Sequence, residues 1–221
     1  MRMVAEKIEA APAAEREPED KGRNFEVLCG VVIALFAAIL AIADLGAGKF
    51  GDDELIAHNQ KNNAYLWFQS KGIKETLVEG QRDTLQTLVD AGSIRPEQLA
   101  GIQGLIGKLD AKAQRYGKEK TEILQGSAAV GQANWVQDVE GEMGKVVGAK
   151  EWETQALALG GAGDTFDFAT LFLQICLVLG AISLVVQGAG TRKAFFLGMI
   201  VLGLVGSVFT VLAFQQAFAI G

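Results

Sequence analysis

The sequence predicts an all-α integral membrane protein with three transmembrane helices and a long extramembrane helical hairpin inserted between the first and second spans. Three observations predict this fold. Residues 27–45, 168–186 and 194–214 are apolar runs in which Asp44 is the only charged residue. Each run has about 19 to 21 residues, enough for a helix to cross a hydrocarbon core about 30 Å thick. The charged residues gather between the first and second runs, which indicates a single polar insert.

The apolar runs divide the chain into a tail, three spans and their connections. The tail is rich in Ala and Glu and contains Pro12 and Pro18, so it buries too little apolar surface to offset the entropy of ordering. We expect the following segments: a disordered cytoplasmic tail at 1–24, the first span at 25–46, the hairpin insert at 47–163, the second span at 164–187, a basic cytoplasmic turn at 188–193, the third span at 194–216 and a C-terminal tail at 217–221.

The first apolar run is expected to be an uncleaved anchor. Ala41-Ile42-Ala43 resembles a signal-peptidase site, but the segment before the run is longer and more acidic than the start of a signal peptide. The run also exceeds the usual apolar region of about 7–15 residues.

Lys and Arg near the spans predict the orientation, because short flanks rich in these residues remain in the cytoplasm. The basic residues concerned are Arg2, Lys7, Arg16, Lys21 and Arg23 before the first span, and Arg192 and Lys193 in the turn between the second and third. With three spans, both segments fall on the same side. We therefore expect a bacterial inner (cytoplasmic) membrane protein with a cytoplasmic N-terminus and a periplasmic insert and C-terminus.

The insert is predicted to begin with a helix that starts at an acidic triplet. Asp52, Asp53 and Glu54 suit a helix N-terminus, where carboxylates meet the positive end of the helix dipole. No proline follows before Pro96. Gly92 can end the first helix in the left-handed conformation, and Pro96 suits the first turn of the next one.

The second helix of the insert has the clearest periodicity. Steps of three and four residues connect Leu99, Ile102, Ile106, Leu109, Ala113, Tyr116, Lys120 and Ile123. Such a stripe predicts a packing seam, interrupted only by Lys120. The seam can close between two antiparallel helices of one chain or between chains, and the cap of this helix can be Ser93 or Arg95.

Beyond the second helix, glycines make the prediction weaker. Residues 127–157 are expected to be helical, with Gly141, Gly144 and Gly148 on one face. A break is expected at residues 160–163, after which Asp164 resembles the cap of the second span.

Composition and motifs exclude several classes of function. The net charge of −6 argues against nucleic acid, because phosphate binding needs clustered Lys and Arg. His58 is the only histidine, and Cys29 and Cys176 lie within predicted spans, so no metal-ligand set is recognisable. Without a catalytic motif, we expect a protein that is not an enzyme and that has no cofactor and no small-molecule substrate.

Inside the spans, polar and small residues indicate helix packing. Gln174, Ser183, Ser207 and Thr210 are the polar side chains, which usually share hydrogen bonds with neighbouring helices. The small-xxx-small pairs Ala34/Ala38, Ala37/Ala41 and Gly203/Ser207 permit close approach of another helix.

Two stretches of the insert and one span carry a resemblance to a known family. Residues 62–75, with the sequence NNAYLWFQSKGIKE, resemble the characteristic stretch of the bacterial membrane family of domain-of-unknown-function 4337. Residues 115–123 and the span around 166–183 are also similar to it. The resemblance implies a tail, a span, a helical insert and two C-terminal spans over nearly the whole chain, but no activity. The glycines at 126–148 depart from the charged pattern of the family.

The aromatic cluster in the first stretch has two interpretations. Tyr65, Trp67 and Phe68 can form the core of the hairpin or anchor another subunit, because Trp and Tyr are frequent in interface hot spots. In the first case, Gln69, Lys71 and Lys74 would form a solvated face.

Together these features predict a non-enzymatic scaffold or accessory subunit. It would associate with itself or with a larger membrane protein complex through the insert and the faces of the spans. The residues expected to take part are Tyr65, Trp67, Phe68, Leu99, Ile102, Ile106, Leu109, Tyr116, Gln174, Gly203 and Ser207. The alternative is a small oligomeric channel or transporter in which the second and third spans line a pore.

Overall fold

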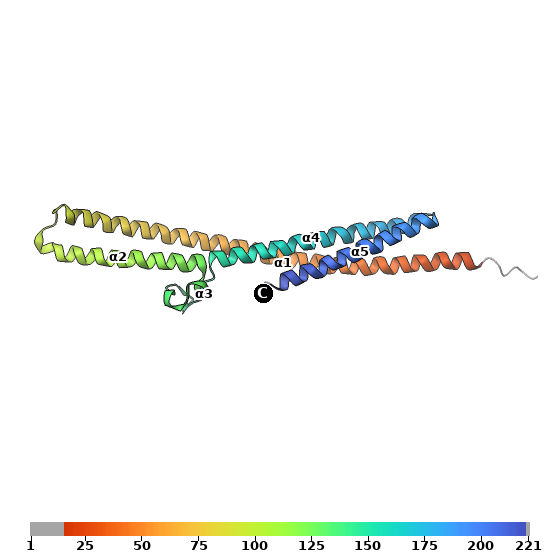
Figure 1. The fold of residues 1–221 in the computed structure, drawn as a ribbon, viewed down its shortest axis with the longest axis horizontal. Helices are drawn as coiled ribbons and strands as arrows, with labels where there is room; N and C mark the ends of the chain where they lie inside the picture. The colour runs from red at the N-terminus through yellow and green to blue at the C-terminus, as the bar shows by residue number, and fades with distance from the viewer. Residues whose placement is uncertain (1–15, 220–221) are drawn as a thin grey trace, which may run out of the picture. The chain divides into compact units, whose positions relative to one another are not determined.

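The computed structural model describes residues 16–219, with side chains described from residue 23 onward. Almost all of this chain is helical (Figure 1). The elements are α1 (Arg16–Asp90), α2 (Pro96–Gln125), α3 (Ser127–Val130), the 3₁₀ helix η1 (Gln132–Asn134), β1 (Asp138–Val139), β2 (Glu142–Met143), α4 (Ala149–Val185) and α5 (Ala189–Phe218). The prediction of a helical protein is confirmed, as is that of three helices long and apolar enough to cross a membrane, which are α1, α4 and α5.

The chain forms two compact units. One contains the chain up to Gly48 together with Gly163–Gln215, and therefore holds the apolar parts of α1, α4 and α5. The other contains Lys49–Ala162 and the residues after Gln215. In this second unit, the C-terminal part of α1 and the whole of α2 run side by side in opposite directions (Figure 1).

In the apolar unit, glycines let the helices approach closely. Gly203 of α5 lies against the ring of Phe36, and a Cβ at Gly180 of α4 would lie 2.7 Å from Ile33 and 2.6 Å from Met199. These contacts bury Phe36 and Met199, whereas large apolar side chains such as Leu35 remain exposed on the outside. The unit is therefore packed through small residues, as is usual for helices that associate in lipid.

The sequence interpretation of α1 was wrong at two places. The helix runs without a break through Asp52, so the acidic triplet is not an N-terminus. Once a helix has formed, each added residue gains a hydrogen bond, and nothing in this stretch stops the propagation. The expected disordered tail at 1–24 is helical from Arg16, because Pro18 lies in the first turn, where a missing N–H has no helical partner to lose. Residues 1–15 lie outside the described part of the chain.

The end of α1 agrees with the sequence. Gly92 has a φ of 65°, and its N–H donates to the carbonyl of Val89 at 3.0 Å. The N–H of Ser93 donates to the carbonyl of Leu88 at 3.1 Å, which completes a Schellman motif. The following helix begins at Pro96 with Arg95 as its cap, so the choice between Ser93 and Arg95 is resolved.

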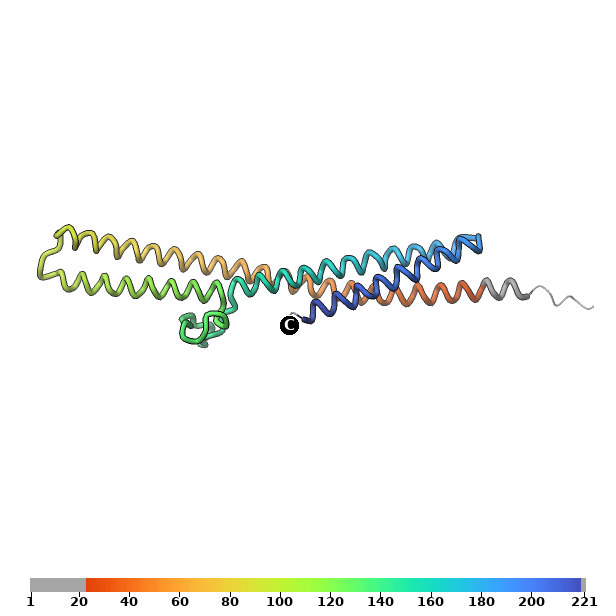
Figure 2. The backbone as a smooth tube through the Cα atoms, in the orientation of Figure 1, coloured from red at the N-terminus to blue at the C-terminus, as the bar shows by residue number. Residues whose placement is uncertain are grey.

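The prediction of helix over residues 127–157 was wrong up to residue 148. The segment contains the short helices α3 and η1, a two-residue antiparallel pair of β1 with β2 and irregular loops, and it is visible as the compact green coil in Figure 2. The glycines explain the difference, because Gly126, Gly131, Gly141 and Gly144 all have positive φ. They turn the backbone rather than share one helical face.

Three expected boundaries around the last two helices were also wrong. No break occurs at residues 160–163, because α4 continues from Ala149 to Val185 and Asp164 caps nothing. Glycine weakens a helix by only about 1 kcal/mol, which packing of the flanking turns can offset. The turn expected at 188–193 is shorter, since α5 begins at Ala189. The expected C-terminal tail at 217–221 is helical through Phe218.

Candidate functional site

The two stretches that resemble the family face one another between α1 and α2. Lys71 Nζ lies 2.6 Å from Glu119 Oε2, and Lys120 Nζ lies 2.6 Å from Glu75 Oε2. Each helix therefore contributes one cation and one anion. The expected solvated face is wrong for Lys71, whose side chain is only 15% exposed because it closes this ion pair.

Aromatic rings surround the two pairs. The ammonium of Lys120 lies 5.3 Å from the ring centre of Phe68, and that of Lys71 lies 5.9 Å from the ring of Tyr116. Cations over ring faces are stabilised by the ring quadrupole. Lys120 thus does not interrupt the α2 seam, because its stem continues the stripe while its charge meets α1. Tyr65 and Trp67 are half-buried in the same region.

Glu119 is the most constrained charge of this cluster, with a side chain that is 4% exposed. Burial raises the pKa of its carboxyl, whereas the hydrogen bond and charge of Lys71 lower it. The amide of Gln137 and the guanidinium of Arg115 act in the same direction, so the pKa of Glu119 lies below its ordinary value of 4.5. The side-chain nitrogen of Gln137 has no hydrogen-bond partner of standard geometry within the described residues. We therefore attribute the lowering of the Glu119 pKa mainly to Lys71.

The predicted α2 seam faces α1 of the same chain. Leu99, Ile102, Ile106 and Leu109 are half-buried, and the seam becomes tighter toward Ala113 and Ile123, which are buried. Arg82 Nη1 crosses from α1 to Asp110 Oδ1 of α2 at 2.9 Å. The apolar half of the seam is therefore looser than the charged half.

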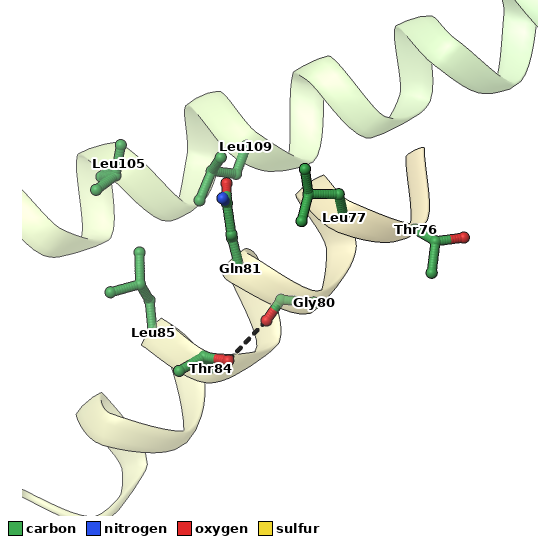
Figure 3. Close-up of a pocket in the computed structure, with 8 residues that line it drawn as sticks. All are labelled: Thr76, Leu77, Gly80, Gln81, Thr84, Leu85, Leu105 and Leu109. Carbon is green, nitrogen blue, oxygen red and sulfur yellow. Dashed lines mark hydrogen bonds between the residues drawn. The ribbon is translucent and has the colours of Figure 1, made fainter. Parts of the chain in front are cut away.

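An apolar hollow of about 670 Å³ opens beside this looser half. Figure 3 shows Leu77 and Leu85 of α1 and Leu105 and Leu109 of α2 around it, with Gln81 between the two helices. No charged residue lines it; the other lining residues are Thr76, Gly80 and Thr84. Leu77 is 62% exposed and Leu105 is 43% exposed, so the helix pair leaves this apolar surface open.

Beyond α2, the buried carboxylate of Glu122 organises the loop 126–148. Its Oε1 accepts from the Ser127 hydroxyl at 2.7 Å, and its Oε2 accepts from the N–H groups of Val136 and Gln137 at 2.8 and 2.9 Å. Ser127 Oγ in turn accepts from the N–H of Val146 at 3.0 Å. One side chain of α2 thus fixes the shape of a segment that has little regular structure.

The hydrogen-bond network of Glu122 was not predicted from the sequence. Its partners lie 5 to 15 residues from Glu122 along the chain, without a helical or strand spacing. The one signal in the sequence for this folded loop was its series of glycines, and Gly148 has the clearest structural reason to be glycine. A Cβ there would collide with the backbone of Gln125 and Gly126, so the loop returns close against the end of α2.

The span residues singled out from the sequence serve packing within the chain. Gly203 lies under Phe36, and the Ser207 hydroxyl donates to the Gly203 carbonyl at 2.7 Å. Gln174, in contrast, is exposed on the outside of α4. The structure therefore brings Gly203 and Ser207 together and leaves Gln174 apart from them.

Within the described residues, no group of three or more His, Cys, Asp or Glu side chains is placed to hold a metal ion. His58 is 43% exposed and lies 3.5 Å from Glu54, one helical turn away.

Comparison with known proteins gives one family match. The family model described as Domain of unknown function (DUF4337) matches residues 25–216, which is most of the chain. No curated protein and no solved structure matches.

Proposed function

The chain belongs to the family described as Domain of unknown function (DUF4337), and from this premise we propose that it is a non-enzymatic membrane scaffold or accessory subunit. It associates with itself, or with a larger membrane protein complex, through its helical insert and the faces of its spans. The proposal is based on the surfaces described above, because the family has no assigned activity.

Membrane insertion is supported by the outer surface of the apolar unit. Its helices are long and apolar enough to cross a bilayer, and large apolar side chains such as Val31, Val178 and Val201 are more than half exposed on them. Such side chains match lipid and not water. By the distribution of Lys and Arg, we place the N-terminus and the α4–α5 turn in the cytoplasm and the insert in the periplasm of a bacterial inner membrane.

A contact between α5 and α1 supports placing the basic N-terminal segment and the basic α4–α5 turn on the same side of the membrane. Arg192, at the start of α5, lies 3.3 Å from Glu26 of α1, and its guanidinium carbon lies 4.3 Å from the ring centre of Phe25. Polar and aromatic groups of this kind are typical of the interface between lipid and water.

The observation that carries the scaffold role is the exposed apolar surface of α1 in the insert. Leu66, Ile73 and Leu77 are 63%, 71% and 62% exposed, although they lie in the charged part of the chain, where water is the expected solvent. Large exposed apolar patches on water-facing parts of a protein mark sites of protein association. This exposed apolar surface supports a role of the insert in protein association.

The test is the mass of the full chain, purified in mild detergent and measured by light scattering with the detergent subtracted. We expect a mass at least twice the 23.5 kDa of one chain, or co-purification with a defined membrane partner from native membranes. A lone monomer without partners in both preparations would contradict the proposal. A soluble monomer in buffer without detergent would contradict membrane insertion.

A channel formed by α4 and α5 is the second candidate and has less support. The buried polar side chains Thr210 and Ser183 have partners within the chain: Thr210 donates to the Gly206 carbonyl at 2.9 Å, and Ser183 lies 3.6 Å from Cys29 Sγ. Ion flux into liposomes that contain only this chain would favour the channel, and sealed liposomes would count against it.

A further inference from the structure

A second seam runs along α1 beside the face whose ion pairs meet α2, and three of its members, Leu77, Gly80 and Thr84, also line the hollow described above. It consists of Asn59, Asn63, Leu66, Ser70, Ile73, Leu77, Gly80 and Thr84. Consecutive members are separated by four and three residues in strict alternation, which is the a/d spacing of a coiled coil. All eight are exposed in the isolated chain. Within the chain, this seam is therefore open along its whole length.

The outward seam contains no charged residue, although the same stretch of α1 is charged elsewhere. Lys71, Glu75 and Arg82 turn toward α2, where each forms an ion pair with it. Other charged residues, such as Lys74 and Asp83, remain exposed beside the seam. The helix thus leaves an uncharged and partly apolar stripe on its outside, where an ordinary surface helix is polar.

The absence of charge favours a second copy of the same segment as the occupant. In a parallel pairing about a two-fold axis, each seam residue meets its own counterpart, so any charge in the seam would meet a like charge. Two hairpins anchored in one membrane with the same orientation also meet in parallel. This argument relies on the proposed self-association and specifies where it occurs.

The individual positions suit such a pair. With Asn63, Ser70, Leu77 and Thr84 at a, the d positions are Asn59, Leu66, Ile73 and Gly80. A single buried Asn at an a position fixes alignment and favours a dimer, the role that Asn63 would have. Nothing lies within 4 Å of a Cβ built at Gly80, so a neighbouring helix has room there.

The flanking positions bring no like charges together. In a parallel dimer, each g residue faces the e residue five positions later in the other helix. Here Gln69 faces Lys74, and Asp83 faces Leu88. We propose that residues 59–84 of α1 form a parallel, in-register coiled coil with the same segment of a second copy of this chain.

Cysteine cross-linking of the full chain in membranes tests the pairing. In a background with Cys29→Ala and Cys176→Ala, we expect Ile73→Cys and Leu77→Cys each to form a disulfide-linked dimer under mild oxidation. Gln86→Cys, which is exposed and lies about 160° around α1 from the middle of the seam, is the matched control and should remain mainly monomeric. Equal cross-linking at all three positions, or none at Ile73→Cys and Leu77→Cys, would overturn the inference.

The direction of pairing is tested by mixing two differently tagged chains. An antiparallel pair over the same residues would join Leu66→Cys to Leu77→Cys rather than each to itself, and this outcome would also overturn the parallel arrangement. Ile73→Asp places two like charges across the seam and should return the chain to a monomer by light scattering with an unchanged far-UV circular dichroism spectrum. If the wild-type chain is oligomeric but neither seam cysteine cross-links, the inference fails and the proposed function stands. If the wild-type chain is a lone monomer, both fail.

Discussion

The ammonium of Lys71 lies 2.6 Å from the carboxylate of Glu119, which is 48 residues further along the chain. This pair joins residues 62–75, on α1, to residues 115–123, on α2. Both side chains are shielded from water, with Lys71 15% exposed and Glu119 4% exposed, so each charge depends on the other for its stabilisation. The contact makes the helix pair sensitive to single substitutions and to pH.

Replacing Lys71 by Met should destabilise the helix pair. The change leaves Glu119 buried with only Arg115, which is 68% exposed, as a cation. Removing one partner of a buried pair costs about 3 kcal/mol, so we expect a loss of that order in the free energy of unfolding, measured by urea titration in detergent. Arg115→Ala is the control and should cost less than about 1 kcal/mol. An equal loss in both variants would contradict the assignment.

Stability should fall in acid because of Glu119. Its pKa is lowered in the folded state, so the contribution is fully present above about pH 4.5 and is lost as the pH falls through the lower folded pKa. Glu119→Gln should therefore reduce the dependence of the melting temperature on pH below 4.5, with little change in slope above it. A variant whose acid slope matches the wild type would show that another carboxylate is responsible.

Replacing Glu122 by Ala should release the loop 126–148 while α1 and α2 persist. Three donors lose their acceptor, and each buried unsatisfied donor costs about 1–3 kcal/mol. The measurement is hydrogen exchange at Val136 and Gln137, which should become fast. Glu140→Ala, on an exposed position of the same loop, serves as the comparison. Slow exchange in Glu122→Ala would mean that the loop is held by other contacts.

Two glycine substitutions should have opposite effects. Gly148→Ala places a Cβ against the backbone of Gln125 and Gly126 and should destabilise the insert. Gly101→Ala, in the second turn of α2 with nothing within 4 Å, should stabilise it by about 0.5–1 kcal/mol, because Gly lowers helix propensity. Thermal unfolding of both variants beside the wild type separates the two outcomes. A stabilised Gly148→Ala would show that the close approach of the loop is absent.

The apolar helices of the fold were predictable because their signal is local. Uncharged runs such as 27–45 identify a long apolar helix without knowledge of any contact. The stop at Gly92 and the restart at Pro96 were equally local, since one residue needs positive φ and the other cannot continue a helical hydrogen bond.

The errors came where local signals compete with contacts made far along the chain. Asp52 and Asp164 look like helix starts, but helices already formed on either side propagate through them. Conversely, residues 127–148 were assigned to a helix, although the Glu122 carboxylate provides their backbone with other partners. The pairing of Lys120 with Glu75 was not found because a charged residue within a seam suggests an interruption, and its counterpart is on another helix.

The order of charges on the two helices limits how far they can slide. Lys71 precedes Glu75 by one turn on α1, and these residues oppose Glu119 and Lys120 of α2. If α1 slid by one turn along α2 in one direction, Glu75 would lie beside Glu119. A slip of one turn in the other direction would place Lys71 beside Lys120. Either slip therefore sets like charges against each other where both are shielded from water. Repeated Leu and Ile alone would tolerate such a slip. The two ion pairs therefore hold α1 and α2 in one register and oppose sliding of one helix along the other.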